Sequence, residues 1–104
     1  MNRVDFASGG VNPPHTHPRA TESGVVFEGK LTMFCTPRGL VHIQLNVGEG
    51  KALLLVAFNS QLPGIALVPP SLFGTTPPIP NQVLTKAFQV GDDVINEIKS
   101  KFCA

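Results

Sequence analysis

The sequence predicts an all-β domain with a helical appendage at its C-terminal end, on three observations. Ten glycines and ten prolines among 104 residues indicate many turns between short elements. Apolar and polar residues alternate in several segments of residues 1–70, as is typical of strands. The pattern then becomes helical over residues 81–102. At this length we expect one domain over residues 1–104, with the β portion at 1–70 and the helices at 81–102.

In the first part of the chain, the expected elements are short strands and loops. Residues 1–7 alternate and predict a strand, and the glycines and prolines of residues 8–14 predict a loop. Residues 15–19 form a short segment that ends near Pro18. A longer strand is expected over residues 24–34, broken by a turn at 28–30.

The middle of the chain contains the clearest strand. A tight turn at residues 37–39 leads into residues 41–47, where His42, Gln44 and Asn46 alternate with apolar residues, so the strand is two-faced. A hairpin turn is expected at 48–50. The continuous apolar run at 52–58 then predicts a strand buried on both faces.

The C-terminal part begins with a short strand at residues 64–68 and an extended segment at 72–80, where Pro77, Pro78 and Pro80 oppose a helix. We expect Asn81 to cap a helix over residues 82–88. A second helix opens at residues 91–93, with basic residues near its end and one apolar face, made of Val94, Ile95, Ile98 and Phe102. These helices either cover the core or bind a partner.

Charge and composition exclude several classes of function. The net charge of +1 and the absence of a basic stripe argue against nucleic acid, and no cationic amphipathic face points to a membrane. The longest apolar run, residues 52–58, is too short to cross a bilayer, and residues 1–6 have no apolar core of a signal peptide. Cys35 and Cys103 either pair or remain free; we expect free thiols.

Four residues predict a metal site: His15, His17, Glu22 and His42. His15 and His17 are two apart, so both imidazoles project to the same side of an extended segment. Glu22 follows after a turn, and His42 lies on the polar face of its strand. Three imidazoles and a carboxylate suit a divalent first-row metal with open positions for water or substrate. The alternative is that these are ordinary loop and strand histidines.

The spacing around these residues resembles the two motifs of the cupins, and the residues between them resemble the germins and germin-like proteins of plants. Gly9 and Gly29 bracket the first three ligands at the first motif's fixed positions, and 37–39, His42 and Asn46 give most of the second. The germin resemblance rests on Arg3-Val4-Asp5-Phe6-Ala7, Asn12-Pro13-Pro14-His15, Pro18-Arg19-Ala20-Thr21-Glu22, Phe58-Asn59-Ser60-Gln61, Leu72-Phe73-Gly74, Pro77-Pro78-Ile79-Pro80 and Val83-Leu84-Thr85-Lys86-Ala87-Phe88.

This resemblance implies a jelly-roll β-barrel that binds Mn(II) through the three histidines and the glutamate. It implies secretion to the plant cell wall or apoplast, a role in defence, and assembly into trimers or hexamers clasped by the C-terminal helices. The implied activity is that of an oxalate oxidase or a superoxide dismutase, acting on oxalate or superoxide. Asn2 and Asn12 match the two asparagines that position substrate in the oxidase, although Asn12 also suits a turn before Pro13.

The chain departs from the family in two places. The first third of a germin, including its signal peptide and a disulfide, has no counterpart. Between Gly29 and Pro37 only seven residues remain where the family has two further strands, so part of one sheet is expected to be missing. Three functions stay open: a manganese oxidoreductase, a metal-binding storage or structural protein without turnover, and an inactive truncated form.

Overall fold

The computed structural model describes residues 1–33 and 36–102 and divides the chain into two compact units. The first unit is Met1–Leu67 and contains the strands found in the described residues. The second is Val68–Ala104 and contains the described helices. Each unit is considered by itself below.

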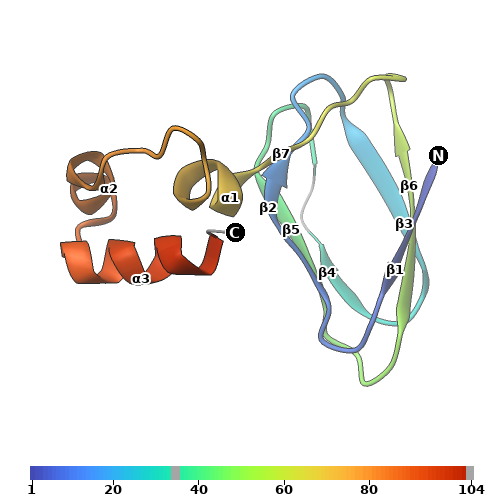
Figure 1. Ribbon diagram of the computed structural model, residues 1–104. Helices are drawn as coiled ribbons and strands as arrows, with labels where there is room; N and C mark the ends of the chain where they lie inside the picture. Colours follow the sequence, from blue (N-terminus) through green and yellow to red (C-terminus); the bar gives the residue numbers. More distant parts are fainter. Residues whose placement is uncertain (34–35, 103–104) are drawn as a thin grey trace. The chain divides into compact units, whose positions relative to one another are not determined.

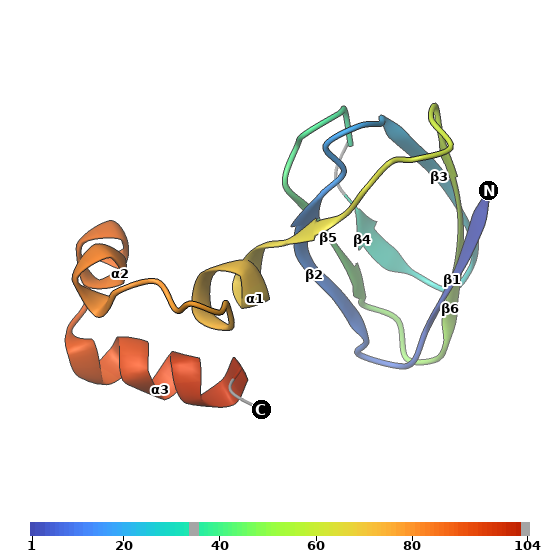
Figure 2. The ribbon, with the colours of Figure 1, turned by 45° about the horizontal axis from the view of Figure 1, so that its top comes forward.

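The first unit consists of two sheets that face each other (Figure 1). The three-stranded sheet, sheet A, has the order β1-β6-β3, from Asn2–Phe6, Ala52–Phe58 and Glu22–Glu28. The four-stranded sheet, sheet B, has the order β4-β5-β2-β7, from Leu31–Met33, His42–Asn46, Val11–Thr16 and Ala66–Leu67. Figure 2 shows the two sheets on opposite sides of the interior. The all-β prediction for this part is confirmed.

The turn at residues 28–30 carries the chain from sheet A to sheet B, which confirms the break expected there. Gly29 has a φ of 87°, and a Cβ atom on it would lie 2.7 Å from the Cα of Ala52. A side chain therefore has no room at this crossing. The strand before the turn begins at Glu22, two residues earlier than expected.

The loop predicted for residues 8–14 is wrong in its second half, because β2 starts at Val11. Pro13 and Pro14 lie inside the strand, where the register with β5 shifts between Asn12 and His15. Proline has no N–H to donate. Where the register shifts, the regular hydrogen bonds between the strands are interrupted, so a main-chain N–H is not needed at these two positions. His15 returns to register opposite His42.

The expected hairpin at residues 48–50 is also wrong. β5 pairs with β2 and β4, whereas β6 pairs with β1 and β3, so this turn joins the two sheets. Nor is β6 buried on both faces: Ala52, Leu54 and Val56 are buried, and the residues between them are half-buried. The strand expected over residues 64–68 is reduced to the two residues of β7.

The interior of the first unit has an apolar side and a polar side. Sheet A contributes a cluster of Phe6, Ala52, Leu54 and Val56, with three half-buried side chains packed on it. β5 of sheet B instead buries His42, Gln44 and Asn46. Burial of the first set stabilises the fold by removing apolar surface from water. The second set requires hydrogen bonds or a ligand.

The second unit contains three helices, α1 (Val68–Phe73), α2 (Asn81–Phe88) and α3 (Asp92–Phe102). The extended segment predicted from residue 72 is wrong for its first two residues, which belong to α1. Pro69 and Pro70 fall in the first turn of α1, where a missing N–H costs no helical hydrogen bond.

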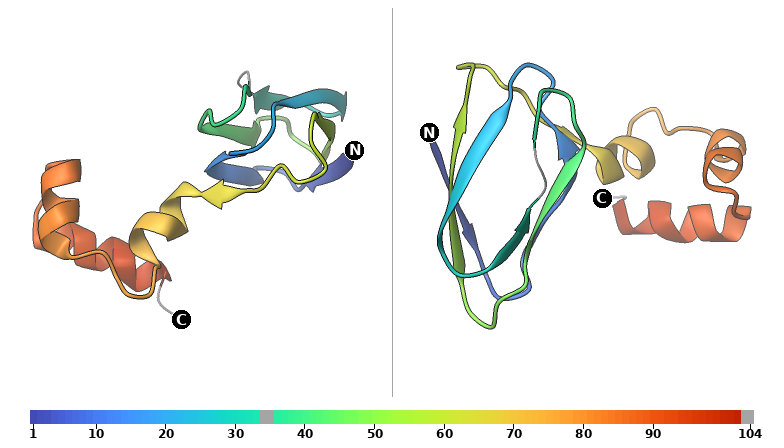
Figure 3. Two further views of the ribbon diagram at one scale, coloured as in Figure 1. Left: turned by 90° about the horizontal axis from the view of Figure 1, so that it is seen from above. Right: turned by 180° about the vertical axis from the view of Figure 1, so that it is seen from behind.

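The two later helices form as expected, and both views in Figure 3 show the chain turning back between them. The predicted cap is wrong: Pro80 occupies the cap position of α2, and Asn81 is the first helical residue. The Asn81 side chain instead donates to Asn96 Oδ1 at 2.7 Å and accepts from Lys99 Nζ at 2.7 Å. Leu84 and Ile95 are the buried residues of these two helices.

Candidate metal centre

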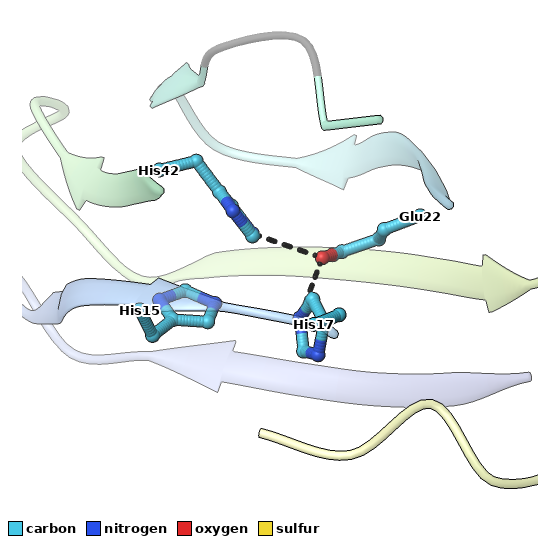
Figure 4. Close-up of side chains that lie close together, drawn as sticks. All are labelled: His15, His17, Glu22 and His42. Carbon is cyan, nitrogen blue, oxygen red and sulfur yellow. Dashed lines mark hydrogen bonds and ion pairs between the residues drawn. The ribbon is translucent and has the colours of Figure 1, made fainter. Parts of the chain in front are cut away.

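The two sheets bring the four predicted ligands together at one end of the interior. His15 lies in β2 and pairs with His42, the first residue of β5, while His17 follows directly after β2. Glu22 comes from the other sheet, as the first residue of β3. One ligand atom from each residue lies within 4.8 Å of the other three, and all four residues are buried. Figure 4 shows the side chains converging from the separate strands.

The main chain determines which nitrogen of each histidine faces the centre. Nδ1 of His15 lies 2.7 Å from the carbonyl of Pro13, that of His17 2.7 Å from Gly64, and that of His42 2.9 Å from Leu40. A carbonyl can only accept, so each Nδ1 carries a proton and donates it. The neutral imidazole then has a lone pair on Nε2, the form in which histidine binds a metal.

The Glu22 carboxylate supplies the negative charge of the cluster. Its Oε2 lies 2.9 Å from His17 Nε2 and 3.1 Å from His42 Nε2 (Figure 4). With Nδ1 protonated in both rings, neutral imidazoles would direct lone pairs at an anionic oxygen. A metal cation among them would be attracted to both nitrogens and to the oxygen, so these atoms can act together as ligands.

The neutral form of His15 is favoured by its surroundings. Burial lowers the pKa of His15 below its ordinary value of 6.5, with smaller contributions in the same direction from His42 and His17. The hydrogen bond to Pro13 and the charge of Glu22 act in the opposite direction. A lowered pKa disfavours a second proton on this ring, so that Nε2 stays available near neutral pH, which favours metal binding.

A hydrogen-bond chain behind the ligands orients Glu22. Gln44 Nε2 donates to Glu22 Oε1 at 3.3 Å, and Asn12 Nδ2 donates to Gln44 Oε1 at 2.9 Å. The direction follows from the carboxylate, which can only accept and so requires the amide nitrogen of Gln44. Oε1 is held by Gln44, while Oε2 faces the histidines.

Gln44 is the residue that the motif analysis missed. It is 1% exposed and shares the inner face of β5 with His42, which lies two residues before it. That spacing was visible in the sequence, but a glutamine on a polar strand face does not by itself indicate contact with a ligand. Asn12 lies one step behind the ligands, through Gln44, and Asn2 lies at the exposed start of β1.

The donor set fits a divalent first-row metal. Three imidazole nitrogens and one carboxylate oxygen offer four ligands of the type that Mn, Fe, Zn and Cu accept. Each imidazole is held through its other nitrogen, as metal-binding histidines usually are. The cluster can therefore hold a metal ion.

This fold and this cluster place the chain in the cupin family. The family model described as Cupin matches residues 1–36 and 32–96, and the chain belongs to this family.

Within the cupins the relatives are germin-like proteins and oxalate oxidases. "Germin-like protein subfamily T member 2" of Arabidopsis thaliana is 54% identical over 98% of this chain. "Oxalate oxidase 2" of Hordeum vulgare is 50% identical over all of it. A solved structure described as oxalate oxidase in complex with the substrate analogue glycolate matches 97% of the chain with a TM-score of 0.92 and 50% identity. The germin-like resemblance and the cupin jelly-roll fold are thus confirmed.

The chain spans about half the length of the curated relatives it matches, 55% and 56% for these two, and 61% of the solved chain. The match to the barley protein extends over 126 aligned positions, which exceeds the 104 residues of this chain by 22. At least that many positions of the relative have no counterpart. The two segments of the family match meet at residues 32–36, which agrees with the shortened link inferred between Gly29 and Pro37.

Two further sequence predictions concern the membrane and the cysteines. In residues 1–33 and 36–102, no helix has the length and apolar character that a membrane span requires. Cys35 and Cys103 lie outside the described residues, so the expectation of free thiols stays a prediction.

Proposed function

We propose that this chain is a manganese-binding germin-like protein whose metal ligands are His15, His17, Glu22 and His42. One observation carries the proposal: three Nε2 atoms and one carboxylate converge, and every Nδ1 is held by a main-chain carbonyl. Because a carbonyl accepts from each Nδ1, the Nε2 atoms of all three rings face the centre before any ion arrives.

The choice of Mn(II) rests on the family, because the ligand types alone suit several metals. Mn(II) is at the weak end of the affinity series, so the same residues accept Zn(II) or Cu(II) where these are supplied. When bound, manganese would supply the redox chemistry of oxygen or superoxide. Elemental analysis of protein purified from its natural source checks the metal, since a recombinant host selects its own.

We further propose oxalate as the substrate, because several relatives are named as oxalate oxidases. The part of the Asn12 side-chain amide that is not bonded to Gln44 would form a hydrogen bond with an oxalate-like anion. Asn2 would assist as the second asparagine. Superoxide is the alternative substrate for the same site.

The test is hydrogen peroxide release that depends on added oxalate, with the metal-loaded full chain. His42→Ala removes one ligand and should abolish both the release and the stabilisation by Mn(II). Thr85→Val changes a side chain whose hydroxyl bonds to Gln82 within α2, outside the ligand cluster, and serves as the control. Equal release from His42→Ala and the unchanged protein would overturn the proposal.

A second candidate function is metal binding without turnover, as a storage or structural protein of the cell wall. The shortened link between Gly29 and Pro37, which contains β4 and leads from β3 to β5, favours it, because part of a sheet around the site has no counterpart here. A metal-loaded protein that is silent toward both oxalate and superoxide would establish this function. Failure of the melting temperature to rise with metal would point to the inactive truncated form.

Self-association into a trimer or hexamer is proposed from the outer face of sheet A. Val25 and Phe27 on β3 are 65% and 72% exposed, and Val25 pairs with Leu55 of β6. A hollow of about 300 Å³ on this face is lined partly by Met1, Val25 and Leu55. Apolar surface of this kind marks an interaction site. Light scattering of the full chain measures its assembly, and a monomer would overturn this proposal.

We also propose that residues 1–104 act as one shortened cupin domain, with the barrel portion at 1–70 and the helices at 81–102 serving assembly. Its proposed location is the plant apoplast, with a role in defence, as for the family. Tagged protein expressed from its native locus and imaged after plasmolysis tests the location, and fluorescence retained within the protoplast would overturn it.

A further inference from the structure

Glu22 lies on an edge strand of its sheet, although its side chain is buried. β3 lies at the edge of sheet A, with β6 as its strand neighbour on one side and no strand on the other in residues 1–33 and 36–102. Glu22 pairs with Phe58 of β6. The six residues of β3 after Glu22 are all exposed. Edge strands separate readily from a sheet, so the only carboxylate of the cluster needs a further attachment.

Thr36 provides that attachment on the open side of β3. The main-chain N–H of Glu22 donates to the carbonyl of Thr36 at 3.1 Å, and the Thr36 hydroxyl donates to the carbonyl of Glu22. The two residues form an isolated antiparallel bridge, and Thr36 is 5% exposed. Both main-chain polar groups of Glu22 on this side are thereby satisfied.

The residues after Thr36 continue along the ligand segment. Arg38 N–H donates to Thr21 Oγ1 at 3.2 Å, and Gly39 N–H donates to the carbonyl of His17 at 3.0 Å. Gly39 has a φ of 78°, which glycine adopts without strain. Residues 36–39 are therefore bonded to residues 17–22 at three places, two of which are the metal-ligating residues His17 and Glu22.

We propose that Thr36 is a positioning residue for the metal centre, because its hydroxyl holds Glu22 on the open edge of β3. The inference rests on the proposed metal site. Thr36 acts on the main chain of Glu22, whereas Gln44 acts on its carboxylate. Glu22 is thus held at its main chain and at its carboxylate, and loss of either attachment raises the free-energy cost of bringing Oε2 to the histidines.

A purely structural threonine would behave differently. Loss of its hydroxyl would lower the unfolding free energy of the metal-free chain, since the Glu22 carbonyl would lose a buried partner. The affinity of the folded protein for metal would then be unchanged. A positioning residue changes that affinity, and a hydroxyl restored by serine recovers it.

The experiment uses the full chain and two variants, Thr36→Val and Thr36→Ser. Valine keeps the shape and removes the hydroxyl, whereas serine keeps the hydroxyl and removes the methyl group. Thr85→Val is the matched control, because its hydroxyl bonds to Gln82 within α2 of the second unit. Titration with Mn(II) chloride, and separately Zn(II) chloride, measures affinity well below the melting temperature of each variant.

We expect Thr36→Val to bind metal about tenfold more weakly than the unchanged chain, the effect typical of removing a partner of a metal ligand. Thr36→Ser and Thr85→Val should bind as the unchanged chain does. Equal affinity in Thr36→Val overturns the proposal. If Thr36→Val does not fold, Thr36→Ala takes its place with Thr36→Ser as its matched control. Weaker metal binding by the alanine than by the serine variant supports a role for the hydroxyl, and equal binding overturns it.

Hydrogen exchange at the Glu22 amide separates this inference from the proposed function. If the unchanged chain binds neither metal, the metal-site proposal fails on its own. Faster exchange at Glu22 in metal-free Thr36→Val than in Thr36→Ser still supports the attachment, because it reports opening of the bridge directly. Equal exchange rates in the two variants overturn it.

Discussion

Strands β5 and β6 follow each other in the chain and share an alternation of buried and half-exposed residues, but their buried faces differ in chemistry. β6 buries Ala52, Leu54 and Val56, whereas β5 buries His42, Gln44 and Asn46. The apolar face of β6 lies in the core cluster, and the polar face of β5 reaches the candidate metal centre. One sheet thus supplies most of the apolar core, and the other carries most of the candidate metal ligands.

The comparison teaches that a buried strand face need not be the apolar one. A buried polar side chain is stable only when its hydrogen bonds are made, and β5 meets this condition along its length. Asn46 bonds to the carbonyls of Ala7 and Gly50, and Gln44 bonds to Glu22 and Asn12. Four predictions separate the apolar from the polar contribution, beginning with the largest effect.

Leu54→Ala removes a buried side chain from the apolar side of the interior. Leu54 is fully buried in the core cluster, so we expect the variant to lose about 3 kcal/mol of unfolding free energy through lost burial and a cavity. Urea denaturation measures the loss. Leu53→Ala, on the opposite face of the same strand, is the control and should cost less. Equal losses would mean that β6 does not have one buried and one open face.

Asn46→Ala removes a polar side chain of β5 at the end away from the candidate metal ligands. Its side-chain amide donates to Ala7 and Gly50 at 2.8 and 2.7 Å and accepts from the Gly48 N–H at 3.0 Å. Leaving these groups unpaired should lower the unfolding free energy by about 2 kcal/mol. The same urea measurement shows it. Metal affinity of the folded variant should be unchanged. A large drop would show that Asn46 also contributes to the metal centre.

Gln44→Met removes the polar group of β5 that bonds to Glu22 in the candidate metal centre. Methionine approximates the volume of glutamine but cannot donate to Glu22 Oε1. Calorimetric titration should show about tenfold weaker metal binding, or about 1.4 kcal/mol. Asn12→Ala, one bond further away, should show a smaller loss. Native affinity in Gln44→Met would show that the amide does not orient the carboxylate.

The smallest effect expected is on pH dependence. The pKa of His15 is lowered in the folded protein, chiefly by burial, so the unfolded chain takes up the proton first. The stability from this residue is fully present above its ordinary pKa of 6.5 and is lost as pH falls through the lower folded value. Urea denaturation of metal-free protein between about pH 5 and 8 measures this.

His15→Asn is the matched variant for the pH series, and its unfolding free energy should depend less on pH over the same range. Leu54→Ala should lose stability by the same amount at each pH, since no titrating group is removed. A pH profile unaffected by His15→Asn would show that other groups dominate.

Much of the candidate centre could be predicted from the sequence, because ligand spacing is a local property. His15 and His17 are two apart on an extended segment, and His42 alternates with apolar residues, so their sides of the chain follow from strand geometry. Gln44 follows the same alternation, but its contact with Glu22 depends on how the two sheets face each other.

The errors in the fold share a physical cause. Pro13 and Pro14 enter β2, and Pro69 and Pro70 enter α1, because proline is excluded only where its missing N–H would be needed. Whether that N–H is needed depends on the neighbouring strand or on the position within the helix turn. Neither the neighbouring strand nor the position within the helix turn can be read from the sequence of one segment alone.

The sequence by itself determined the ligand types, their spacing, the positions of most turns and the family. Only the tertiary structure decided that the polar face of β5 turns inward, that the turn after it joins two sheets, and that Thr36 lies against Glu22. The reason is that alternation defines two faces of a strand but not which one is buried. That choice depends on partners far away in the chain.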